Sequence, residues 1–590
     1  MKPYLKKYVW VINIIGVLAE WGFPCHATAA YLMKINNQTL FKSINNNITQ
    51  AIANGHKDIQ IIIEPGVYYY HKNHIDRINE QQPDLSISIK GQQAILIAAG
   101  NDYHDGETYK GQFHHTNTFV DSDTHEFYDC WDDCIFADGL IKVVDEKKKL
   151  CFLPYSKAVN FINDDVSKMY ITITEWFRSY TFRVHKIDSN GILFVADNLA
   201  YIQNFGTEGY NINYDYIYGR QLPRFILCNP SAKKKKVNIN HGKIYYGKGK
   251  RIHECTTSCF LNLNNNTYNS FTLSGLHFIG DKGGTQLLQI QNTKAKQITI
   301  SSCHFEGIRS LILSADQTDN LVFKSNLCRQ CSGFGIRATN SCGNITVVNN
   351  QFDNMGKDMT QTSCVSCKGH NYYIAHNTFK NFGYCAIDIG VWYRAQKDFI
   401  SSGIVEYNHI YYDKEYLANK EHHTLMDSGA IYTCTQNDDA TIRYNYIHDY
   451  AGMKHNRGIF CDDGANHLRI YGNIVIHTSH YAIDSRLCRN VIENNNMDNQ
   501  VMYNIVDGAN LFQGKDIVNN MCVKKRNYTL VRAGNKSPKH IYEYIEKSEE
   551  DIYLSYEGWD NQGIIVNQGT WNQLKRMPYF KHIKQYIRRR

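Results

Sequence analysis

The chain repeats one short phrase along residues 270–520, and this repeat constrains the fold more than any other feature. The phrase is an alternating apolar strand, a turn holding a small or amide residue, and then a large apolar residue. Its tightest spacing is about 23–24 residues, and the wider gaps indicate loops inserted into single coils. The phrase occurs at Phe271–Phe278, Ile298–Phe305, Leu321–Leu327, Ile345–Phe352, Tyr373–Phe379, Ile404–Ile410, Ile442–Ile447, Leu468–Ile474 and Val501–Ile505.

The turn position of the phrase carries the same residue type in most repeats. A single coil cannot bury its own apolar face, so neighbouring coils stack, and asparagines at equivalent turns can hydrogen-bond along the stack. An antiparallel β-sandwich would also show alternating strands, but it does not require one residue type at one turn. We therefore predict an all-β chain built as a right-handed parallel β-helix. The turn position holds Leu276, Cys303, Asn326, Asn350, Asn377, Asn408, Asn445, Asn473 and Asn504.

The first residues resemble an export signal. Lys2, Lys6 and Lys7 precede an apolar run over 8–19, and Ala27-Thr28-Ala29 supplies a small-residue cleavage site. The apolar run is too short to span a membrane. We expect a signal peptide over 1–29 and a mature protein that is secreted, periplasmic or exposed at the cell surface, with no membrane span.

The remaining chain divides into four parts. Ile61–Tyr70 and its neighbours predict N-terminal β-helix coils over 30–120. Longer alternating strands, such as Tyr170–Trp176, predict an inserted antiparallel β-subdomain over 121–258. The main parallel β-helix is expected over 259–535, followed by a tail over 536–590 with short helices near Tyr542–Ile545 and Trp571–Ile587.

Charge and cysteine content restrict the partners. The net charge of +8 can be attributed largely to Lys233–Lys236 and Arg588–Arg590, so we expect no nucleic-acid partner. The C-x-x-C pairs at 328/331 and 364/367 have a spacing that fits zinc. Because other cysteines occupy turn and strand positions of the repeat, buried stacking thiols are favoured over metal ligands. We therefore expect no metal and no cofactor.

A second strand follows each turn and is centred on an isoleucine, at Ile336, Ile387, Ile431, Ile459 and Ile483. Alternation places the residues one and three positions beyond that isoleucine on the outer face. A row of such polar residues on one parallel sheet would form a groove suited to a carbohydrate chain. The loops 391–402 and 411–427 flank these coils, and Trp392 is a candidate stacking platform for a sugar ring. The outer residues are predicted to be Arg337, Asp388, Tyr432, Phe460, Asp462, Asp484 and Arg486.

Two phrases carry carboxylates in this region: Asp427-Ser-Gly-Ala-Ile-Tyr-Thr433 and Arg457-Gly-Ile-Phe-Cys-Asp-Asp-Gly464. Glycosidic cleavage uses paired carboxylates, because one protonates the departing oxygen and the other attacks the sugar or activates water. Asp462-Asp463-Gly464 is equally compatible with a strand-ending turn, where aspartate and glycine are common. Glu406 is a candidate sugar-binding or acid/base residue, or else caps a turn. The substrate-binding candidates are Asp463, Tyr432, Glu406, Arg457, Asp388 and Trp392.

Residues 400–475 resemble the β-helix enzymes of glycoside hydrolase family 141, whose known activities include α-L-fucosidase and xylanase. The resemblance is carried by Ile404-Val-Glu-Tyr-Asn-His-Ile410, Ile442-Arg-Tyr-Asn-Tyr-Ile-His448 and the two aspartate phrases above. It implies that Asp427 and Asp462 are the catalytic pair, with Asp463 as the substitute for Asp462. The chain departs from the family at Ser485–Asn490, where the family has a Gly-Gly-Arg-Asp-Asn stretch.

The pairing of Asp427 with Asp462 has a geometric condition. In straight strands the two residues would lie roughly 23 Å apart, too far for either hydrolysis geometry. The chain before Gly429 must therefore fold back over the sheet; otherwise Asp462 would pair with Asp388 or Asp484.

These observations favour an exported glycoside hydrolase that acts on an oligo- or polysaccharide of a plant or a host. A polysaccharide lyase or epimerase on the same scaffold is an alternative, with Arg337, Arg457 or Arg486 neutralising a uronate carboxylate. A non-catalytic carbohydrate-binding β-helix is a further alternative. The sequence leaves the oligomeric state open.

Overall fold

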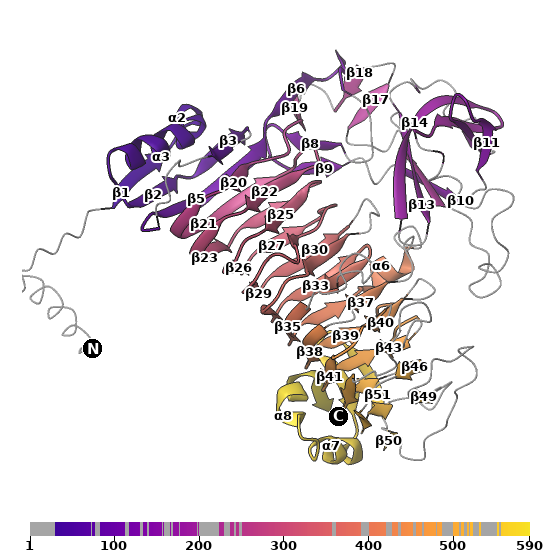
Figure 1. Ribbon diagram of the computed structural model, residues 1–590. Coiled ribbons are helices and arrows are strands. Elements are labelled where there is room, and N and C mark those ends of the chain that lie inside the picture. The colour runs from indigo at the N-terminus through magenta and orange to yellow at the C-terminus, as the bar shows by residue number, and fades with distance from the viewer. Residues whose placement is uncertain are drawn as a thin grey trace, which may run out of the picture.

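The chain forms a long stack of parallel strands with a separate group of antiparallel sheets beside its N-terminal half (Figure 1). The computed structural model describes residues 30–71, 73–76, 83–111, 117–129, 134–138, 141–155, 157–158, 166, 169–175, 178–197, 199, 224–228, 237–240, 243–246, 251–356, 362–390, 401–419, 428–434, 438–451, 456–462, 465–479, 481–485, 499–506, 509–512, 516–518, 520–522, 530–532, 552–553 and 556–590.

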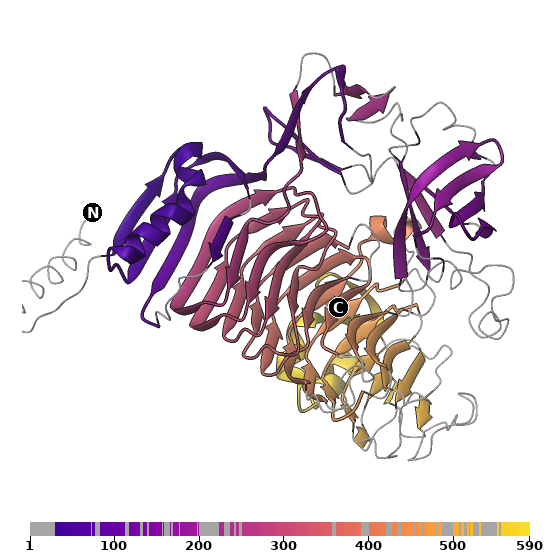
Figure 2. The same ribbon diagram turned by 45° about the horizontal axis from the view of Figure 1, so that its top comes forward.

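Two parallel sheets build the stack, and Figure 2 shows their strands running side by side from coil to coil. Sheet A has 24 strands and sheet B has 12. A typical coil contributes two consecutive strands to sheet A and then one strand to sheet B, as β26, β27 and β28 do. This topology confirms the predicted parallel β-helix. Its right-handed sense stays a prediction, based on the near-universal handedness of parallel crossovers.

The strands of sheet A fall into two rows. The first row contains β1 (Tyr31–Ile35), β2 (Asp58–Ile63), β5 (Ser86–Ala98), β21 (Thr267–Ile279), β23 (Lys294–Ser301), β26 (Leu321–Lys324), β29 (Thr346–Val348), β32 (Tyr372–Ala375), β35 (Ser401–Glu406), β38 (Asp438–Arg443), β41 (Arg469–Tyr471), β44 (Gln500–Met502) and β47 (Asp516–Val518). The long strands β5 and β21 run through both rows. The second row contains β3 (Gly66–Tyr70), β24 (His304–Glu306), β27 (Leu327–Arg329), β30 (Gln351–Met355), β33 (Thr378–Phe382), β36 (His409–Tyr411), β39 (Tyr446–His448), β42 (Ile474–Ile476), β45 (Ile505–Val506), β48 (Met521–Cys522) and β50 (Ile552–Tyr553).

Sheet B forms another side of the stack. It contains β4 (Asn73–Asp76), β20 (Leu261–Asn264), β22 (Gln286–Gln291), β25 (Leu311–Asp316), β28 (Ile336–Ala338), β31 (Ser363–Cys367), β34 (Cys385–Asp388), β37 (Gly429–Thr433), β40 (Arg457–Cys461), β43 (Tyr481–Ser485), β46 (Ala509–Phe512) and β49 (Leu530–Arg532).

The turn between the two rows of sheet A holds the predicted asparagine ladder. In Asn377, Oδ1 accepts from the backbone N–H of Asn350 at 2.9 Å, and Nδ2 donates to the carbonyl of Val347 at 2.9 Å and to Oδ1 of Asn408 at 3.0 Å. The same bonds recur from coil to coil, and the ladder continues to Asn520. The residue before each ladder asparagine from Asn326 to Asn504 has a left-handed backbone, as at His376 with φ 57° and Gly472 with φ 65°. The ladder thus satisfies buried turn groups that the strands leave unpaired.

The interior of the stack is apolar and contains aligned rings. Phe278 stacks on Phe305, and Phe352 stacks on Phe379 at a centroid distance of 4.9 Å. Twelve cysteines whose side chains the structure describes are buried, which confirms the expectation of buried thiols for these positions.

The chain leaves the stack after β5 and returns at β20, because β5 pairs directly with β21. Three antiparallel sheets form between these points. A seven-stranded sheet contains β10 (Cys134–Asp138), β16 (Arg224–Cys228), β13 (Tyr170–Glu175), β14 (Arg178–Asp188), β15 (Gly191–Val195), β12 (Leu150–Pro154) and β11 (Lys142–Asp145). Two smaller sheets contain β6 (Gly100–His104), β19 (Arg251–Cys255), β8 (Thr118–Asp121) and β9 (Phe127–Asp129), and β17 (Asn238–Asn240), β18 (Lys243–Tyr245) and β7 (Glu107–Thr108).

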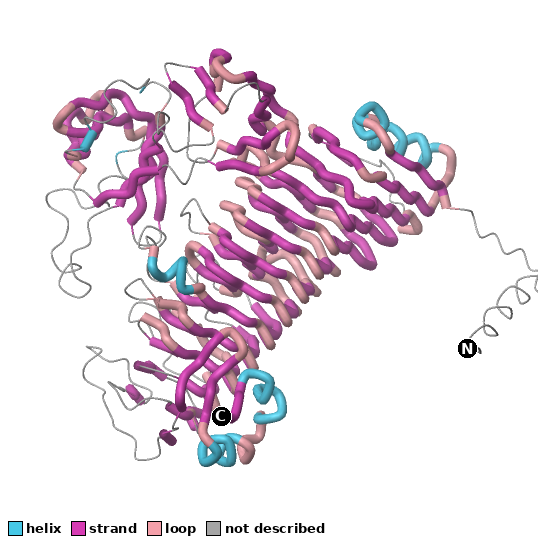
Figure 3. Tube along the Cα trace, turned by 180° about the vertical axis from the view of Figure 1, so that it is seen from behind, coloured by secondary structure: helices cyan, strands magenta, loops and turns pink. Residues whose placement is uncertain are grey.

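Helices are few and lie mainly near the ends of the stack (Figure 3). At the N-terminal end are α2 (Gln38–Lys42) and α3 (Ile44–Ala53), which bury Phe41, Ile44 and Ile48 in the main core. The short helix α6 (Lys414–Ala418) follows β36. Among the described residues, no helix combines the length and the apolar character that a membrane crossing requires.

The C-terminal segment packs on the outside of the last coils. It contains β51 (Tyr556–Asp560), β52 (Gly563–Val566), α7 (Gln568–Leu574), α8 (Phe580–Ile583), a 3₁₀ turn (Lys584–Tyr586) and β53 (Ile587–Arg589). Its buried residues share one cluster with Tyr444 and Ile474, and the hydroxyl of Tyr407 lies 2.6 Å from Nδ1 of His582. The expected helix at 542–545 lies outside the described residues.

Candidate functional site

The outer face of sheet B carries the row of side chains that alternation predicted. Strand register aligns Arg337 with Ser366, and Ser366 with Asp388. The row continues through Tyr432 and Phe460 to Asp484. Residues from six coils that are distant in the sequence therefore form one line along the stack, which confirms the predicted alignment.

In four strands of sheet B, the alternation of inward and outward residues is interrupted just before the residue that belongs to this row. In β34, β37 and β43, an alanine and the following isoleucine both belong to the main core, so two consecutive residues point inward. In β40 the equivalent pair is Gly458-Ile459, and a Cβ at Gly458 would lie 2.2 Å from Cγ1 of Val475. The residue before the small one consequently points outward, and this places Arg457 on the outer face beside Phe460.

Asp462 is a half-buried carboxylate immediately after β40. Its backbone N–H donates to the carbonyl of Thr433 at 2.7 Å, which continues the pairing of β40 with β37. The hydroxyl of Tyr432 donates to Oδ2 of Asp462 at 3.2 Å. Two predicted site residues, Tyr432 and Asp462, are thus brought into contact across neighbouring coils.

Asp388 occupies the coil before Tyr432 and is held by a cation. The ammonium of Lys368 lies 3.2 Å from Oδ2 of Asp388, and the Ser366 hydroxyl donates to the same oxygen at 3.3 Å. The backbone N–H of Gly390 donates to Oδ1 at 3.1 Å. The charge of Asp388 raises the pKa of the Lys368 ammonium, so this ammonium is positively charged at neutral pH.

Gly390 keeps this part of the face free of a side chain. A Cβ at position 390 would lie 2.2 Å from the backbone nitrogen of Cys434, so the close approach of the two coils requires glycine. The thiol of Cys434 is buried, and burial raises its pKa, with a further contribution from the charge of Asp388.

Asp388 and Asp462 are separated by two coil steps and by two residue positions along the strand direction. At about 4.8 Å per coil and about 3.3 Å per residue, their Cα atoms lie roughly 12 Å apart. Carboxyl groups in inverting glycosidases are about 6.5–9.5 Å apart. Asp388 is held toward the coil before it by Ser366 and Lys368, whereas Asp462 contacts Tyr432 in the coil between the two aspartates.

Arg457 and Asp484 form a buried ion pair. Nε of Arg457 lies 2.8 Å from Oδ2 of Asp484, and the two side chains are 1% and 0% exposed. The guanidinium also stacks over the ring of Phe460 at 3.8 Å. Arg457 was predicted to bind substrate and Asp484 was an alternative partner of Asp462, but this burial leaves neither side chain accessible from solvent.

Glu406 lies in another part of the structure. It is on β35 in sheet A, where its Oε2 pairs with Nε of Arg443 at 2.5 Å and its Oε1 accepts from the Tyr373 hydroxyl at 2.9 Å. The side chain is only 8% exposed. The structure therefore does not bring Glu406 together with Asp462, which is on sheet B.

The catalytic candidate Asp427 and the substrate-binding candidates Asp463 and Trp392 lie outside the described residues, as does Arg486. Sequence reasoning missed Lys368 as a neighbour of Asp388. A signal was present, because Lys368 follows the core residue Val365 by the same three positions that separate Asp462 from Ile459. The strand was overlooked because its central residue is valine rather than isoleucine.

Comparison with known proteins gives matches among solved structures alone: no protein-family model and no curated protein matches the chain. XylC in complex with xylose is 9% identical, with 80% of this chain and 71% of that chain covered and a TM-score of 0.34. The tailspike of Acinetobacter baumannii bacteriophage AP22, in complex with a capsular saccharide of that bacterium, is 9% identical over 83% of this chain and 76% of its own, with a TM-score of 0.18. A double mutant of the periplasmic alginate epimerase AlgG is 14% identical over 47% and 75% of the two chains, with a TM-score of 0.21.

Proposed function

We propose that the chain is a glycan-active β-helix protein that hydrolyses glycosidic bonds on the outer face of sheet B. The observation that supports this most directly is the contact between the Tyr432 hydroxyl and the half-buried carboxylate of Asp462. The ionic pair of Asp388 and Lys368 lies within two coils of it. The resemblance to glycoside hydrolase family 141 assigns a catalytic role to the same aspartate.

Asp462 shares the acid and the nucleophile or base roles with a second carboxylate. The family resemblance gives that role to Asp427, and the register of sheet B offers Asp388 as the other candidate. Asp388 suits the ionised role, because Lys368 stabilises its charge at 3.2 Å. The tyrosine hydroxyl orients Asp462 by donating to its Oδ2 atom.

The lyase or epimerase alternative requires a cation that meets a uronate carboxylate. Arg457 is buried against Asp484 and Phe460 and is unsuited to that role. Arg337 is exposed on the same row and remains the described arginine that could perform it. The cationic partner of Asp388 favours hydrolysis, since it stabilises the charge of a carboxylate that can serve as base or nucleophile on the outer face of sheet B.

The export signal over 1–29 belongs to the same proposal, since a polysaccharide substrate is met outside the cytoplasm. N-terminal sequencing of the protein recovered from the culture medium or the periplasm is expected to begin near residue 30. Recovery of the intact N-terminus from the cytoplasm would contradict it.

A screen of nitrophenyl glycosides and polysaccharides tests the activity in four aspartate variants. Asp462→Asn is expected to lower kcat by about 100-fold or more. The second carboxylate is whichever of Asp427→Asn and Asp388→Asn gives a comparable loss. Asp439→Asn is the matched control, because Asp439 is an exposed carboxylate on sheet A that pairs with Arg469 at the surface.

The products distinguish the alternatives. New reducing ends without the ultraviolet band of an unsaturated sugar support hydrolysis, and that band would indicate a lyase. Saccharide binding without product, unchanged in Asp462→Asn, would indicate a carbohydrate-binding protein and contradict the proposal.

A further inference from the structure

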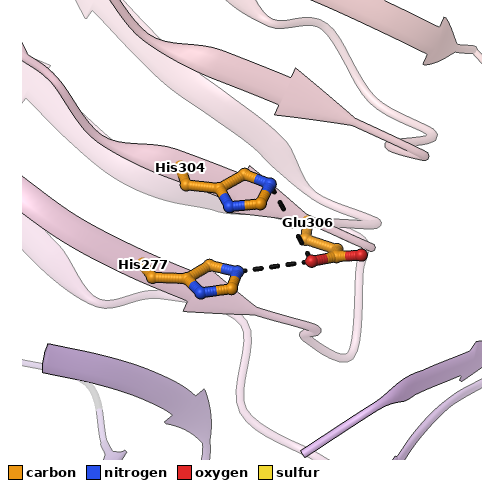
Figure 4. A group of neighbouring side chains, drawn as sticks. All are labelled: His277, His304 and Glu306. Carbon is orange, nitrogen blue, oxygen red and sulfur yellow. Dashed lines mark hydrogen bonds and ion pairs between the residues drawn. The ribbon is translucent and has the colours of Figure 1, made fainter. Parts of the chain in front are cut away.

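A second group of side chains that could bind a ligand lies on sheet A. Its strands belong to earlier coils than the strands of sheet B that carry Asp388 and Asp462. His277 is on β21, and His304 and Glu306 are on β24 in the next coil. Register places His277 directly beside His304. Alternation turns all three side chains outward, since Phe278 and Phe305 between them lie in the core. Figure 4 shows both imidazole rings directed toward the carboxylate of Glu306.

The three side chains are spaced like ligands of one metal ion. Nε2 of His277 lies 3.3 Å from Oε2 of Glu306, and Nε2 of His304 lies 3.8 Å from the same oxygen. The ligand atoms of all three residues are within 4.8 Å of one another. In a tetrahedral zinc site with bonds of about 2.0–2.1 Å, neighbouring ligand atoms are about 3.4 Å apart. The observed separations need only small side-chain adjustments to reach this value.

The hydrogen bonding of the group is incomplete at one atom. Nε2 of His304 is buried and has no hydrogen-bond partner among the described residues. Oε2 of Glu306 lies 3.8 Å from this atom, and His277 offers a ring nitrogen within 4.8 Å. A buried polar atom without a partner is rare in folded proteins and calls for an explanation such as an ion at that position.

Arg329 fixes the carboxylate from the opposite side. Its guanidinium binds Oε1 of Glu306, which leaves Oε2 directed at the histidines. Outer contacts of this kind orient metal ligands in known sites. Burial would raise the pKa of Glu306, but the hydrogen bonds from His277 and Arg329 lower it to about 2. Burial lowers the pKa of His304 to about 4, with a smaller effect of His277, so its imidazole is neutral at pH 7.

We propose that His277, His304 and Glu306 bind a divalent transition metal ion of the Zn²⁺ type, with water in the fourth position. Two imidazoles and one carboxylate are a known three-residue ligand set for zinc with an open position. The side chains are 29%, 27% and 13% exposed, so solvent reaches the site. Sequence reasoning missed this site, although His277 and His304 occupy the same position of two successive repeats, directly before the final phenylalanine.

An alternative use of Glu306 is structural. It begins a row of alternating charges in which Glu306, Arg329, Asp353 and Lys380 are aligned coil by coil. That row accounts for Oε1 of Glu306 through Arg329. It does not account for the unpaired Nε2 of His304, which the metal would satisfy.

The position of the site indicates what a bound metal would do. One residue beyond Glu306, a Cβ at Gly307 would lie 2.3 Å from the ring of Phe127 on β9. The guanidinium of Arg309 also approaches that ring, at 5.7 Å. The metal would therefore join two coils at the point where the inserted sheets contact the stack. Binding to the folded state alone would stabilise this junction.

Zinc binding by the full-length protein tests the proposal. After treatment with EDTA and gel filtration, the protein is titrated with Zn²⁺ by calorimetry, and bound metal is measured by mass spectrometry. We expect one Zn²⁺ per chain, a rise in Tm with zinc, and visible absorption bands of tetrahedral Co²⁺ when cobalt replaces zinc. His304→Phe keeps the stacked ring and Glu306→Gln keeps the side-chain shape, so both variants should fold.

Each of these two variants is expected to weaken Zn²⁺ binding by at least about 100-fold, since even the loss of an outer contact weakens metal sites by about 10–100-fold. His104→Gln, which alters an exposed histidine on β6, is the control and should bind zinc as the wild type does. Absence of stoichiometric zinc in the wild type would overturn the proposal. Equal affinity or an equal rise in Tm in His304→Phe and Glu306→Gln would also overturn it.

Discussion

The asparagine ladder makes a quantitative prediction for Asn377→Ala. The wild-type side chain is 1% exposed and forms hydrogen bonds to both neighbouring coils. Alanine removes them and leaves two buried backbone groups without their partners: the N–H of Asn350 and the carbonyl of Val347. The amide of Asn350 keeps its bond to the carbonyl of Phe323, and Oδ1 of Asn408 keeps its bond from the backbone of residue 377.

The magnitude follows from these two orphaned groups. A buried donor or acceptor that loses its partner costs about 1–3 kcal/mol, so the unfolding free energy should fall by about 4 kcal/mol. Because each coil contacts only its neighbours, the loss should be concentrated between β29 and β35. Denaturant unfolding followed by circular dichroism measures the loss, and hydrogen exchange measures its location. The backbone amide of Asn350 is expected to exchange much faster in the variant.

A second row of asparagines supplies the control. Asn344 is exposed, and its amide donates to Oδ1 of Asn320 at 3.0 Å. Asn344 also accepts from Nδ2 of Asn371 at 3.3 Å, and its φ of 54° is one that glycine accepts, so Asn344→Gly removes two exposed ladder bonds without backbone strain. This variant should change the unfolding free energy by about 1 kcal/mol or less. A loss below about 1 kcal/mol in Asn377→Ala, or an equal loss in both variants, would refute the reasoning.

Three further predictions concern buried ionisable groups. Burial raises the pKa of Asp281 to about 6 in the folded state, above its ordinary value of 3.8. The folded state therefore binds more protons between pH 4 and 6, and this group's contribution of about 3 kcal/mol to the unfolding free energy is lost as pH rises through that window. Asp281→Asn should abolish this part of the pH dependence in denaturant titrations; an unchanged slope would contradict it. Arg457→Met should destabilise the protein by about 3–5 kcal/mol because it removes the cation from the buried carboxylate of Asp484, and adding Asp484→Asn should restore part of the loss. Burial raises the pKa of Cys331 to about 12, so iodoacetamide should label its peptide only after unfolding, and labelling of the native protein would disprove the burial.

The repeat in the sequence was sufficient to predict the stacked coils and most of the strand residues that point away from the core. The recurring asparagine marks the turn, and alternation around each core isoleucine assigns the outer residues. Both are local properties of the backbone, since successive residues of a regular strand point to opposite faces. This is why the row from Asp388 through Tyr432 to Asp484 could be predicted before the strands were paired. Arg457 is an exception, because the inward-pointing pair Gly458-Ile459 that follows it interrupts the alternation.

The same local rule failed to show which outer residues are accessible. Arg457 and Asp484 are outward but buried, because they neutralise each other from adjacent coils. Glu406 pairs with Arg443, which lies in the next coil of sheet A. Alternation says nothing about a partner that arrives from a neighbouring coil.

The sequence by itself determined the repeat, the turn chemistry and the face of each strand, because these depend on a few consecutive residues. Only the tertiary structure decided which residues meet between coils. The pairing of β5 with β21 spans an insertion, and the approach of His277 to His304 and Glu306 joins neighbouring coils. Coils stack about 4.8 Å apart whatever the length of chain between them, so contacts along the stack are fixed by register rather than by sequence spacing.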